Sequence, residues 1–411
     1  MVKLSQGCLP LLGLVLWHLL KAAWSAPLPA DLGDFEVPAG YAYQGRVKFT
    51  TKRYPVSPTY DLNRKTKPRD PAKPLYSILI TSSGHKFTKR LPNFEAGSLH
   101  DAFFDAAEPE EMALYHASRR ARKLAGDVSV EEVTSSATGS TTATDTRTRV
   151  SSATKYPYSA TGMLLGEEGT SNEYLQCTGA LLDTAHILTA AHCDWTNEAT
   201  SAADRTYVST LNIYPRREWR HPSSTSLGVY TWHSVKSYNT EATNYDFALI
   251  TLKSATNPGV AQHPHKTSDR LICLFRPPTT GSQTITLTTA GYPGDKTPSY
   301  SMWTTSCASN TFTYTSNLAA SDDCSTASCQ NWVAHNCYSY NGQSGSPMWD
   351  SSVDVRAVLT GEATLSSDGT TVSSGIATAI DAFTYNTIAT WFTEDNSTTA
   401  FSPVSASSCT S

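Results

Sequence analysis

Short β-type segments fill the chain from about residue 150 onward. Apolar, β-branched or aromatic residues, often alternating with polar ones, form the runs YSATGMLL, HILTAA, DFALITL, TITLTTAGY and VRAVLTGEA. Clusters of Gly, Pro, Asn and Ser separate these runs, as turns separate short strands. The pattern predicts an all-β domain over residues 150–411.

The region before this domain has a different pattern. Residues 26–135 lack cysteine and contain a proline-rich lead, RDPAKPLYSILI, and one helix candidate, EPEEMALYHASRRARKLAGD. In that helix Pro109 suits the first turn, the glutamates lie at the positive end of the dipole and RRARK lies at the negative end. We interpret residues 26–135 as a separate propeptide. The basic residues RRARK then either stabilise the negative end of the helix dipole or form a site where the precursor is cleaved. Lys89-Arg90 is a weaker alternative cleavage site.

A linker joins the two regions. The stretch VTSSATGSTTATDTRT is rich in Ser, Thr and Gly and has no apolar periodicity, so it cannot pack a core. We expect a linker and maturation region at residues 136–149.

The N-terminus is typical of a secretory signal peptide. Lys3 precedes an apolar run from Leu9 to Leu20, and small residues follow at Ala23 and Ser25. A membrane anchor is the alternative, but the run is shorter than the ~20 residues that span a bilayer, and His18 interrupts it. We therefore expect residues 1–25 to be removed, and the mature protein to be secreted and extracellular, without a membrane attachment.

Composition and cysteine usage agree with an extracellular globular protein. The chain has 411 residues, 39% hydrophobic and 17% charged, with a formal net charge of −4, which disfavours nucleic acid as a partner. Of the 9 cysteines, Cys8 would leave with the signal peptide, and the even remainder all follow residue 170. This distribution predicts disulfides confined to one domain.

Three separate short motifs carry candidate chemistry. TAAHC holds His192 beside Cys193, which a hairpin could join to Cys177, and TNYDF places Asp246 just before an apolar strand. Each residue alone is compatible with a structural role. A histidine held in one orientation can nevertheless act as a general base, and a buried aspartate can fix its tautomer.

The third motif is NGQSGSPM, a glycine-rich turn around two serines. Ser344 is the candidate nucleophile, whereas Ser346 precedes a proline and suits a supporting role. The backbone N–H groups of Gly342 and Ser344 could form an oxyanion hole. The order His192, Asp246, Ser344 is compatible with one triad assembled from distant parts of an all-β domain.

In these residues the chain resembles the trypsin-like (chymotrypsin-fold) serine proteases, and within them the glutamyl endopeptidase or V8-like branch. The segments DTRTRVSSATKYPYSATGML, TNYDFALITL, AGYPGDKT and YNGQSGSPMW carry the resemblance over about residues 145–395. It implies two six-stranded antiparallel β-barrels, His192 as general base, Asp246 as its orienter and Ser344 as nucleophile. It also implies a mature N-terminus between about residues 124 and 149.

The substrate pocket departs from the glutamate-specific pattern. Those proteases use a histidine to meet the substrate carboxylate, and here Leu359 takes that position, or Thr360 if the alignment shifts by one residue. Ser339 matches a retained hydroxyl position. Because leucine donates no hydrogen bond, we expect neutral or small residues before the cut rather than glutamate.

The sequence thus predicts a secreted serine endopeptidase, made as a zymogen and acting as a monomer on proteins or peptides. The alternative is a catalytically silent homologue that serves as a binding module. Acyl transfer by a triad needs no cofactor or metal, and we expect none. Asn396 in NST is a candidate glycosylation site.

Overall fold

The structure is a computed structural model. It describes residues 28–32, 35–49, 76–90, 145–153, 155–167, 174–182, 185–194, 206–207, 210–215, 230–238, 245–253, 273–274, 281–314, 332–367 and 370–395. The expected signal peptide, the helix candidate at 108–127, most of the linker and Asn396 lie outside these ranges. Cys324, Cys329 and Cys409 do so as well.

Six antiparallel strands form the first barrel. They are β6 (Thr161–Glu167), β7 (Tyr174–Leu181), β8 (His186–Thr189), β10 (Thr210–Pro215), β11 (Tyr230–Tyr238) and β12 (Ala248–Leu252). The hydrogen-bonded order is β11-β10-β6-β7-β8-β12, and an additional pairing of β12 with β11 closes the ring. Inward-facing residues of these strands, such as Leu164, Ile187 and Val235, form one buried apolar cluster.

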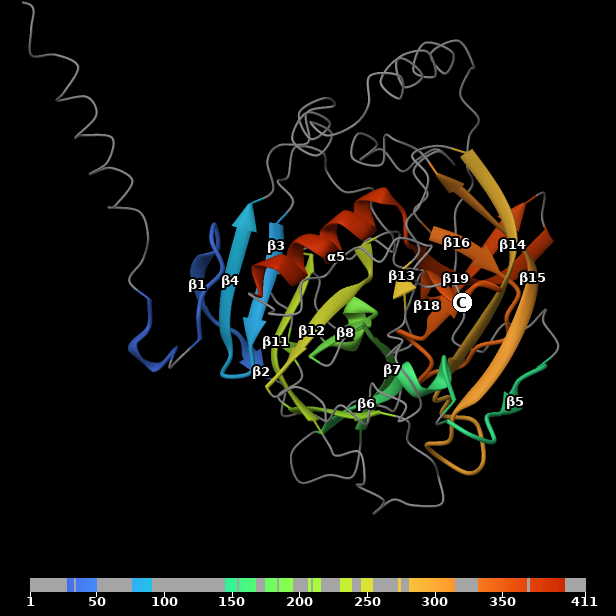
Figure 1. The fold of residues 1–411 in the computed structure, drawn as a ribbon, viewed down its shortest axis with the longest axis horizontal. Helices are drawn as coiled ribbons and strands as arrows, with labels where there is room; N and C mark the ends of the chain where they lie inside the picture. Colours follow the sequence, from blue (N-terminus) through green and yellow to red (C-terminus); the bar gives the residue numbers. More distant parts are fainter. Residues whose placement is uncertain are drawn as a thin grey trace, which may run out of the picture.

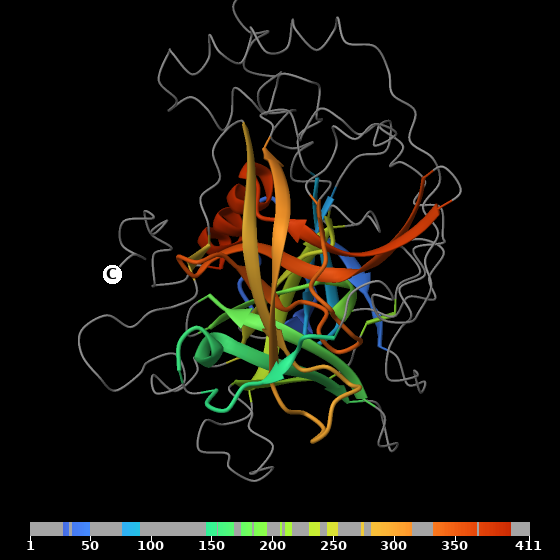
Figure 2. The same cartoon turned by 90° about the vertical axis from the view of Figure 1, so that its right-hand side faces the viewer.

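The second barrel is built from six later strands. They are β14 (Gly281–Gly291), β15 (Trp303–Tyr314), β16 (Trp332–His335), β17 (Pro347–Trp349), β18 (Asp354–Ser367) and β19 (Thr370–Ala379), in the order β16-β19-β18-β17-β14-β15. Two short strands are added at its margins: β5 (Thr148–Arg149) pairs with β15, and β13 (Cys273–Leu274) pairs with β18. The long strands of this barrel stand to the right of the first barrel in Figure 1, and Figure 2 shows β14 and β15 edge-on. The predicted all-β fold of two barrels is confirmed.

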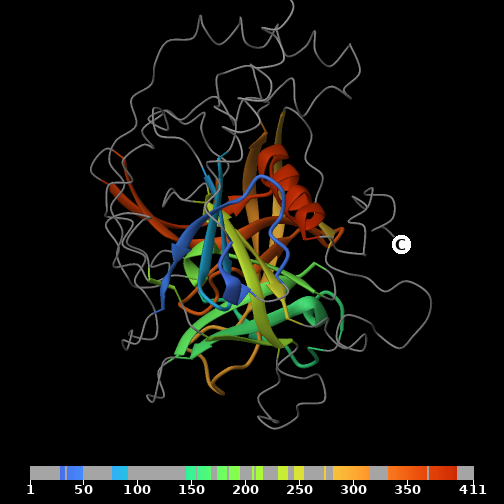
Figure 3. The same cartoon turned by 90° about the vertical axis from the view of Figure 1, so that its left-hand side faces the viewer.

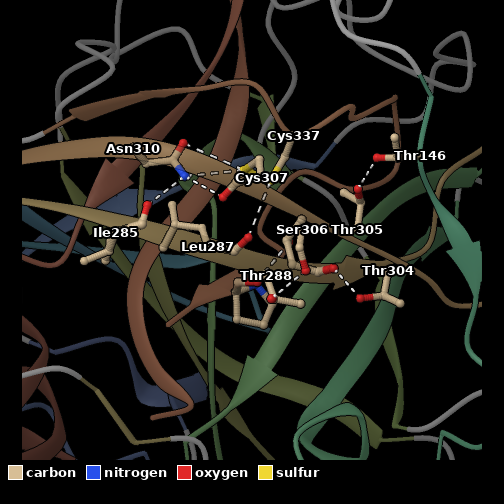
Figure 4. Close-up of a disulfide and its surroundings, with 12 residues drawn as sticks. Thr146, Ile285, Leu287, Thr288, Thr304, Thr305, Ser306, Cys307, Asn310 and Cys337 are labelled. Atoms are coloured by element: carbon tan, nitrogen blue, oxygen red, sulfur yellow. Dashed lines mark hydrogen bonds between the residues drawn. A yellow bond between two sulfur atoms is a disulfide. The ribbon is translucent and has the colours of Figure 1, made fainter. Parts of the chain in front are cut away.

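A disulfide closes the seam of the second barrel. Strands β15 and β16 pack together without backbone pairing, and the Cys307–Cys337 bond joins β15 to the residues just after β16. Figure 4 shows Asn310 beside this bond, where its amide donates to the carbonyls of Cys307 (2.9 Å) and Ile285 (3.2 Å). The sequence left the pairing of these cysteines open.

The expected propeptide contributes strands to the first barrel. It contains β1 (Ala42–Arg46), β2 (Lys48–Phe49), β3 (Tyr76–Thr81) and β4 (His85–Arg90), and the order β1-β4-β3-β11 extends the barrel sheet. Strand β2 pairs in parallel with β9 (Thr206–Tyr207). The described part of residues 26–135 is therefore continuous with the protease fold, and Lys89-Arg90 lies inside β4.

One α-helix occurs among the described residues, and the strand pattern did not predict it. Helix α5 (Ala382–Glu394) begins at Asp381, whose side chain accepts a hydrogen bond from the backbone N–H of Thr384. Its residues Ile388, Trp391 and Phe392 are buried in the apolar cluster of the first barrel. Their helical spacing and the Asp381 cap were the available sequence signals. Within the described ranges no helix combines the length and apolarity needed to cross a membrane.

Candidate active site

His192 and Asp246 form a buried pair in the first barrel. His192 lies in the 3₁₀ turn η3 (Ala191–Cys193), which one residue separates from the end of β8, and Asp246 lies two residues before the start of β12. One carboxylate oxygen of Asp246 lies 2.7 Å from the His192 Nδ1, and the other accepts the backbone N–H of His192 at 2.9 Å. Because β8 and β12 are paired neighbours, the sheet register places the two residues together. The two-point contact fixes both the ring and the backbone of His192.

A disulfide holds the turn that carries His192. Cys193 is bonded to Cys177 on β7, across a separation of 16 residues. Both sulfurs are buried, and the Sγ of Cys193 lies 3.7 Å from the backbone oxygen of Ser344. The Cys177–Cys193 disulfide therefore directly contacts the loop that carries Ser344, called the serine loop below.

Ser344 lies in a tight loop between β16 and β17. The backbone N–H of Gly345 donates to Leu359 at 2.7 Å, and the carbonyl of Ser344 accepts from the N–H of Thr178 at 2.8 Å. A Cβ on Gly345, whose φ is +82°, would lie 2.1 Å from the Thr178 carbonyl oxygen and 2.9 Å from the backbone nitrogen of Ala190. Only glycine lets the loop approach this closely to the chain that leads into His192.

The loop leaves the two expected oxyanion donors available. Among the described residues, no acceptor is bonded to the backbone N–H of Gly342 or of Ser344. Gly342 has a φ of +95°, and a Cβ there would lie 2.4 Å from the carbonyl oxygen of Tyr292. Glycine is therefore required at position 342, because a side chain there would clash with the Tyr292 carbonyl.

Thr178 on the first barrel joins two segments of the second. Its hydroxyl donates to the Gly342 carbonyl at 2.9 Å and accepts from the backbone N–H of Tyr292 at 3.1 Å. Tyr292 begins the YPGDK segment, and Gly294 in that segment donates to the Asn341 carbonyl at 2.7 Å. The YPGDK segment therefore also contacts the serine loop, through Gly294 and Asn341.

A buried arginine also holds the serine loop, and sequence reasoning gave it no role. Arg147, in the RTRV segment, donates from Nη1 to the side-chain oxygen of Gln343 at 3.0 Å. The same oxygen accepts the backbone N–H of Tyr340 at 3.1 Å. Gln343 lies between Gly342 and Ser344 in the chain, so Arg147 fixes the residue between the two expected oxyanion donors.

Four charges balance around Arg147. Its guanidinium is fully buried and pairs with Asp145 and with Asp295 of the YPGDK segment, and Lys296 pairs with Asp145 at 2.6 Å. Burial alone would lower the pKa of Arg147, but the bonds from both carboxylates outweigh it and leave the pKa raised. The hydrogen bond from Arg147, partly opposed by burial, holds the pKa of Asp145 below its usual range. We call Asp145, Arg147, Asp295 and Gln343 the Arg147 clamp.

The three residues expected in the substrate pocket, Ser339, Leu359 and Thr360, are all buried. Leu359 belongs to the apolar cluster of the second barrel, with Cys337, Met348 and Ala357. Thr360 donates its hydroxyl hydrogen to the Ile376 carbonyl at 3.1 Å, so that hydroxyl serves the sheet. Ser339 is also buried. None of these three positions supplies an imidazole.

Two histidines lie beside paired cysteines in a way that could suggest metal binding. The groups are Cys177, His192 and Cys193, and Cys307, His335 and Cys337. In each group the two sulfurs are joined as a disulfide, whereas a metal is held by free thiolates. These groups therefore do not fit a structural zinc site.

A comparison with protein families shows the family to which the chain belongs. The sequence model of the Trypsin family matches residues 146–388. The chain belongs to the trypsin family. The motifs that contain His192, Asp246 and Ser344 all lie within the matched region of this trypsin-family chain.

Similar proteins include bacterial proteases. The chain is 31% identical over 158 residues to the extracellular metalloprotease of Bacillus subtilis (strain 168), covering 38% of this chain and 45% of the relative. It is 25% identical over 209 residues to the glutamyl endopeptidase of Bacillus licheniformis, covering 51% of this chain and 54% of the relative. The trypsin-family chain thus spans about half the length of these curated relatives.

The solved structures that the chain matches include two proteases. One is a Glu endopeptidase in complex with MPD, at 22% identity and a TM-score of 0.42, covering 60% of this chain and 95% of the other. The second is the protease Anisep from Arthrobacter nicotinovorans, at 16% identity and a TM-score of 0.38, covering 59% of this chain and 98% of the other.

Proposed function

We propose that this trypsin-family protein is a secreted serine endopeptidase that acts through His192, Asp246 and Ser344. The observation that carries the proposal is the two-point contact between His192 and Asp246, at 2.7 and 2.9 Å, next to the serine loop. The Asp246 carboxylate holds Nδ1–H, which leaves Nε2 unprotonated and able to accept the Ser344 hydroxyl proton.

The reaction follows from this arrangement. Ser344 Oγ attacks the peptide carbonyl while His192 takes its proton, and the N–H groups of Gly342 and Ser344 stabilise the oxyanion. His192 then gives the proton to the leaving amine, which frees the C-terminal product and leaves an acyl-enzyme on Ser344. Water activated by His192 hydrolyses this ester and regenerates the serine.

Maturation and specificity complete the proposal. Asp145 and Arg147 belong to the Arg147 clamp, so a cut that keeps the clamp must fall before Asp145, which narrows the maturation window to residues 124–144. Leu359 is at the position expected for the pocket histidine and supplies no hydrogen-bond donor there, which favours neutral residues before the cut. The substrates are proteins or peptides, which the enzyme cleaves as a monomer outside the cell.

The test is cleavage of a peptide library in which the residue before the cut varies. The mature wild type is compared with Ser344→Ala and with the matched control Ser346→Ala, which removes a second hydroxyl from the same loop. We expect cleavage after neutral residues, a loss of at least about 1,000-fold in Ser344→Ala, and no more than about a 10-fold change in Ser346→Ala.

Two results would contradict the proposal. A correctly matured wild type that cuts no peptide would leave the binding module as the better interpretation. Equal losses in the two serine variants would show that Ser344 is not the nucleophile. Cleavage mainly after glutamate would overturn only the specificity, because another group would then meet the substrate carboxylate.

A further inference from the structure

Strand β3 completes the hydrogen bonding of the first barrel. Strand β10 pairs with β11 only at Tyr230 and Thr231, and β3 takes over beside β11 from Ser234 to Tyr238. The other edge of β11 pairs with β12. Removal of β3 would leave the backbone N–H and C=O groups of this half of β11 open on one side, and an open strand edge binds other strands.

The same segment fills part of the apolar core. Ile78 and Ile80 on β3 are about 1% exposed and belong to one cluster with Trp232, Val235 and Tyr238 of β11. From β2, Phe49 packs edge-on against Trp232, with ring centroids 6.4 Å apart. Without residues 35–90 these apolar side chains of the barrel would face water.

Polar contacts tie the segment to α5. Lys89 on β4 forms an ion pair with Glu394 at 2.6 Å, and the Tyr41 hydroxyl donates to Glu394 at 3.3 Å. Ser77 on β3 meets both the Tyr41 hydroxyl at 2.7 Å and the indole N–H of Trp391 at 3.1 Å. The helix is thus held by side chains from the expected propeptide.

The segment lies away from the serine loop. Strands β1, β4 and β3 lie at the left margin of Figure 1, on the side of the first barrel that faces away from the second. Figure 3, seen from that side, shows them in front of the first barrel. The described strands of this segment therefore lie on the far side of the first barrel from the second barrel, which carries Ser344 between β16 and β17.

We propose that residues 35–90 stay bound to the protease domain after the chain is cut between residues 124 and 144, so that the mature protein consists of two chains. The partner of the open edge of β11 is therefore the protein's own N-terminal segment. The cut itself belongs to the maturation proposed above, whereas retention depends only on the contacts just described.

The test uses the full chain carrying Ser344→Ala and a recognition sequence for a specific protease inserted between residues 128 and 140. After complete cutting, the sample is run on native gel filtration, and each peak is identified by mass spectrometry. We expect both pieces in one peak that elutes with the uncut chain, and their separation only in denaturant. Elution of the N-terminal piece on its own under native conditions would overturn the proposal.

Two variants of this chain test the contacts that hold the segment. In the double variant Tyr41→Phe and Lys89→Ala, both side-chain links to Glu394 are lost, and we expect release after dilution to be about 3- to 30-fold faster. Gln44→Ala is the control, since Gln44 is exposed and, among the described residues, its side chain donates to the carbonyl of Ala42 on its own strand and not to α5. Equal release rates in the double variant and the control would show that these contacts do not hold the segment.

The outcome is independent of catalysis because the tested chain lacks the serine nucleophile. If the peptide library shows no cleavage, the proposed function fails while the two pieces can still co-elute. If the pieces separate but the library is cut, only the retention fails.

Discussion

At the scale of single residues, Arg147 is the unexpected member of the site. Trypsin-type zymogens pair an aspartate with a newly freed N-terminus at the position where this chain has Gln343, so that ion pair is unavailable here. The Arg147 guanidinium instead donates to Gln343 and is neutralised by Asp145 and Asp295. We interpret Arg147 as a positioning residue that keeps the loop around Ser344 in order.

Arg147→Gln is expected to lower kcat by about 10- to 100-fold while KM changes by less than about 3-fold. The reason is that a displacement of about 1 Å at the reacting groups costs up to about 100-fold in rate. Arg147→Lys keeps the charge but loses the forked geometry, and should recover part of the kcat. Steady-state kinetics on a peptide selected from the library provide the measurement.

Arg149→Gln is the matched control for Arg147, because Arg149 is exposed on β5 and has no place in the clamp. Its kcat should stay at the wild-type value. A normal kcat in Arg147→Gln, or a change confined to KM, would refute the positioning role.

At the scale of elements, residues that flank two paired strands were easier to predict from the sequence than contacts between segments that are far apart in the chain. The His192 and Asp246 motifs flank two strands whose pairing brings them together, so the sequence was sufficient to name both residues. Arg147 meets Asp295 and Gln343 across 148 and 196 residues, and nothing local marks such partners. Strand β3 was missed for the same reason, since its pairing with β11 is non-local.

Strand β16 ends at a histidine that makes stability depend on pH. Burial lowers the pKa of His335 to about 4, although its contacts with the backbone of Ile376 and Cys337 oppose the shift. The folded protein therefore keeps His335 neutral at pH values where the unfolded chain, with a pKa near 6.5, binds a proton. The stability from this group is present above pH ~6.5 and is lost as the pH falls through ~4.

The free energy of unfolding is expected to fall by about 3 kcal/mol from this group between pH ~6.5 and ~4. Urea unfolding of the chain carrying Ser344→Ala, with and without His335→Gln, isolates the effect from the other histidines. The His335→Gln chain is expected to be less stable at neutral pH but to lose less on acidification. Parallel pH profiles for the two chains would argue against this assignment.

At the scale of the whole molecule, the parts of the candidate site that the structure describes are formed in the uncut chain. The His192–Asp246 pair, the serine loop and the Arg147 clamp are all formed in the chain that still carries residues 28–90. We therefore expect that cutting the linker is not needed to order the proposed catalytic residues. On this view, latency of the proposed precursor comes from restricted access to Ser344.

Small serine-reactive reagents should accordingly label the uncut chain at Ser344. We expect a phosphonofluoridate to react with the precursor within about 10-fold of its rate with the cut protein, because the machinery that activates the serine is the same. Intact-mass measurement over time gives both rates, and Ser344→Ala should remain unlabelled. Labelling that starts only after the cut would show that cleavage assembles the site.

Thr178 limits how the two barrels can move. Its backbone N–H bonds to Ser344, and its hydroxyl bridges Gly342 and Tyr292, so any hinge opening between the barrels would break three bonds at once, two of them to the serine loop. Rigid-body opening is therefore incompatible with an intact site. We therefore expect the two barrels to behave as one rigid body throughout turnover.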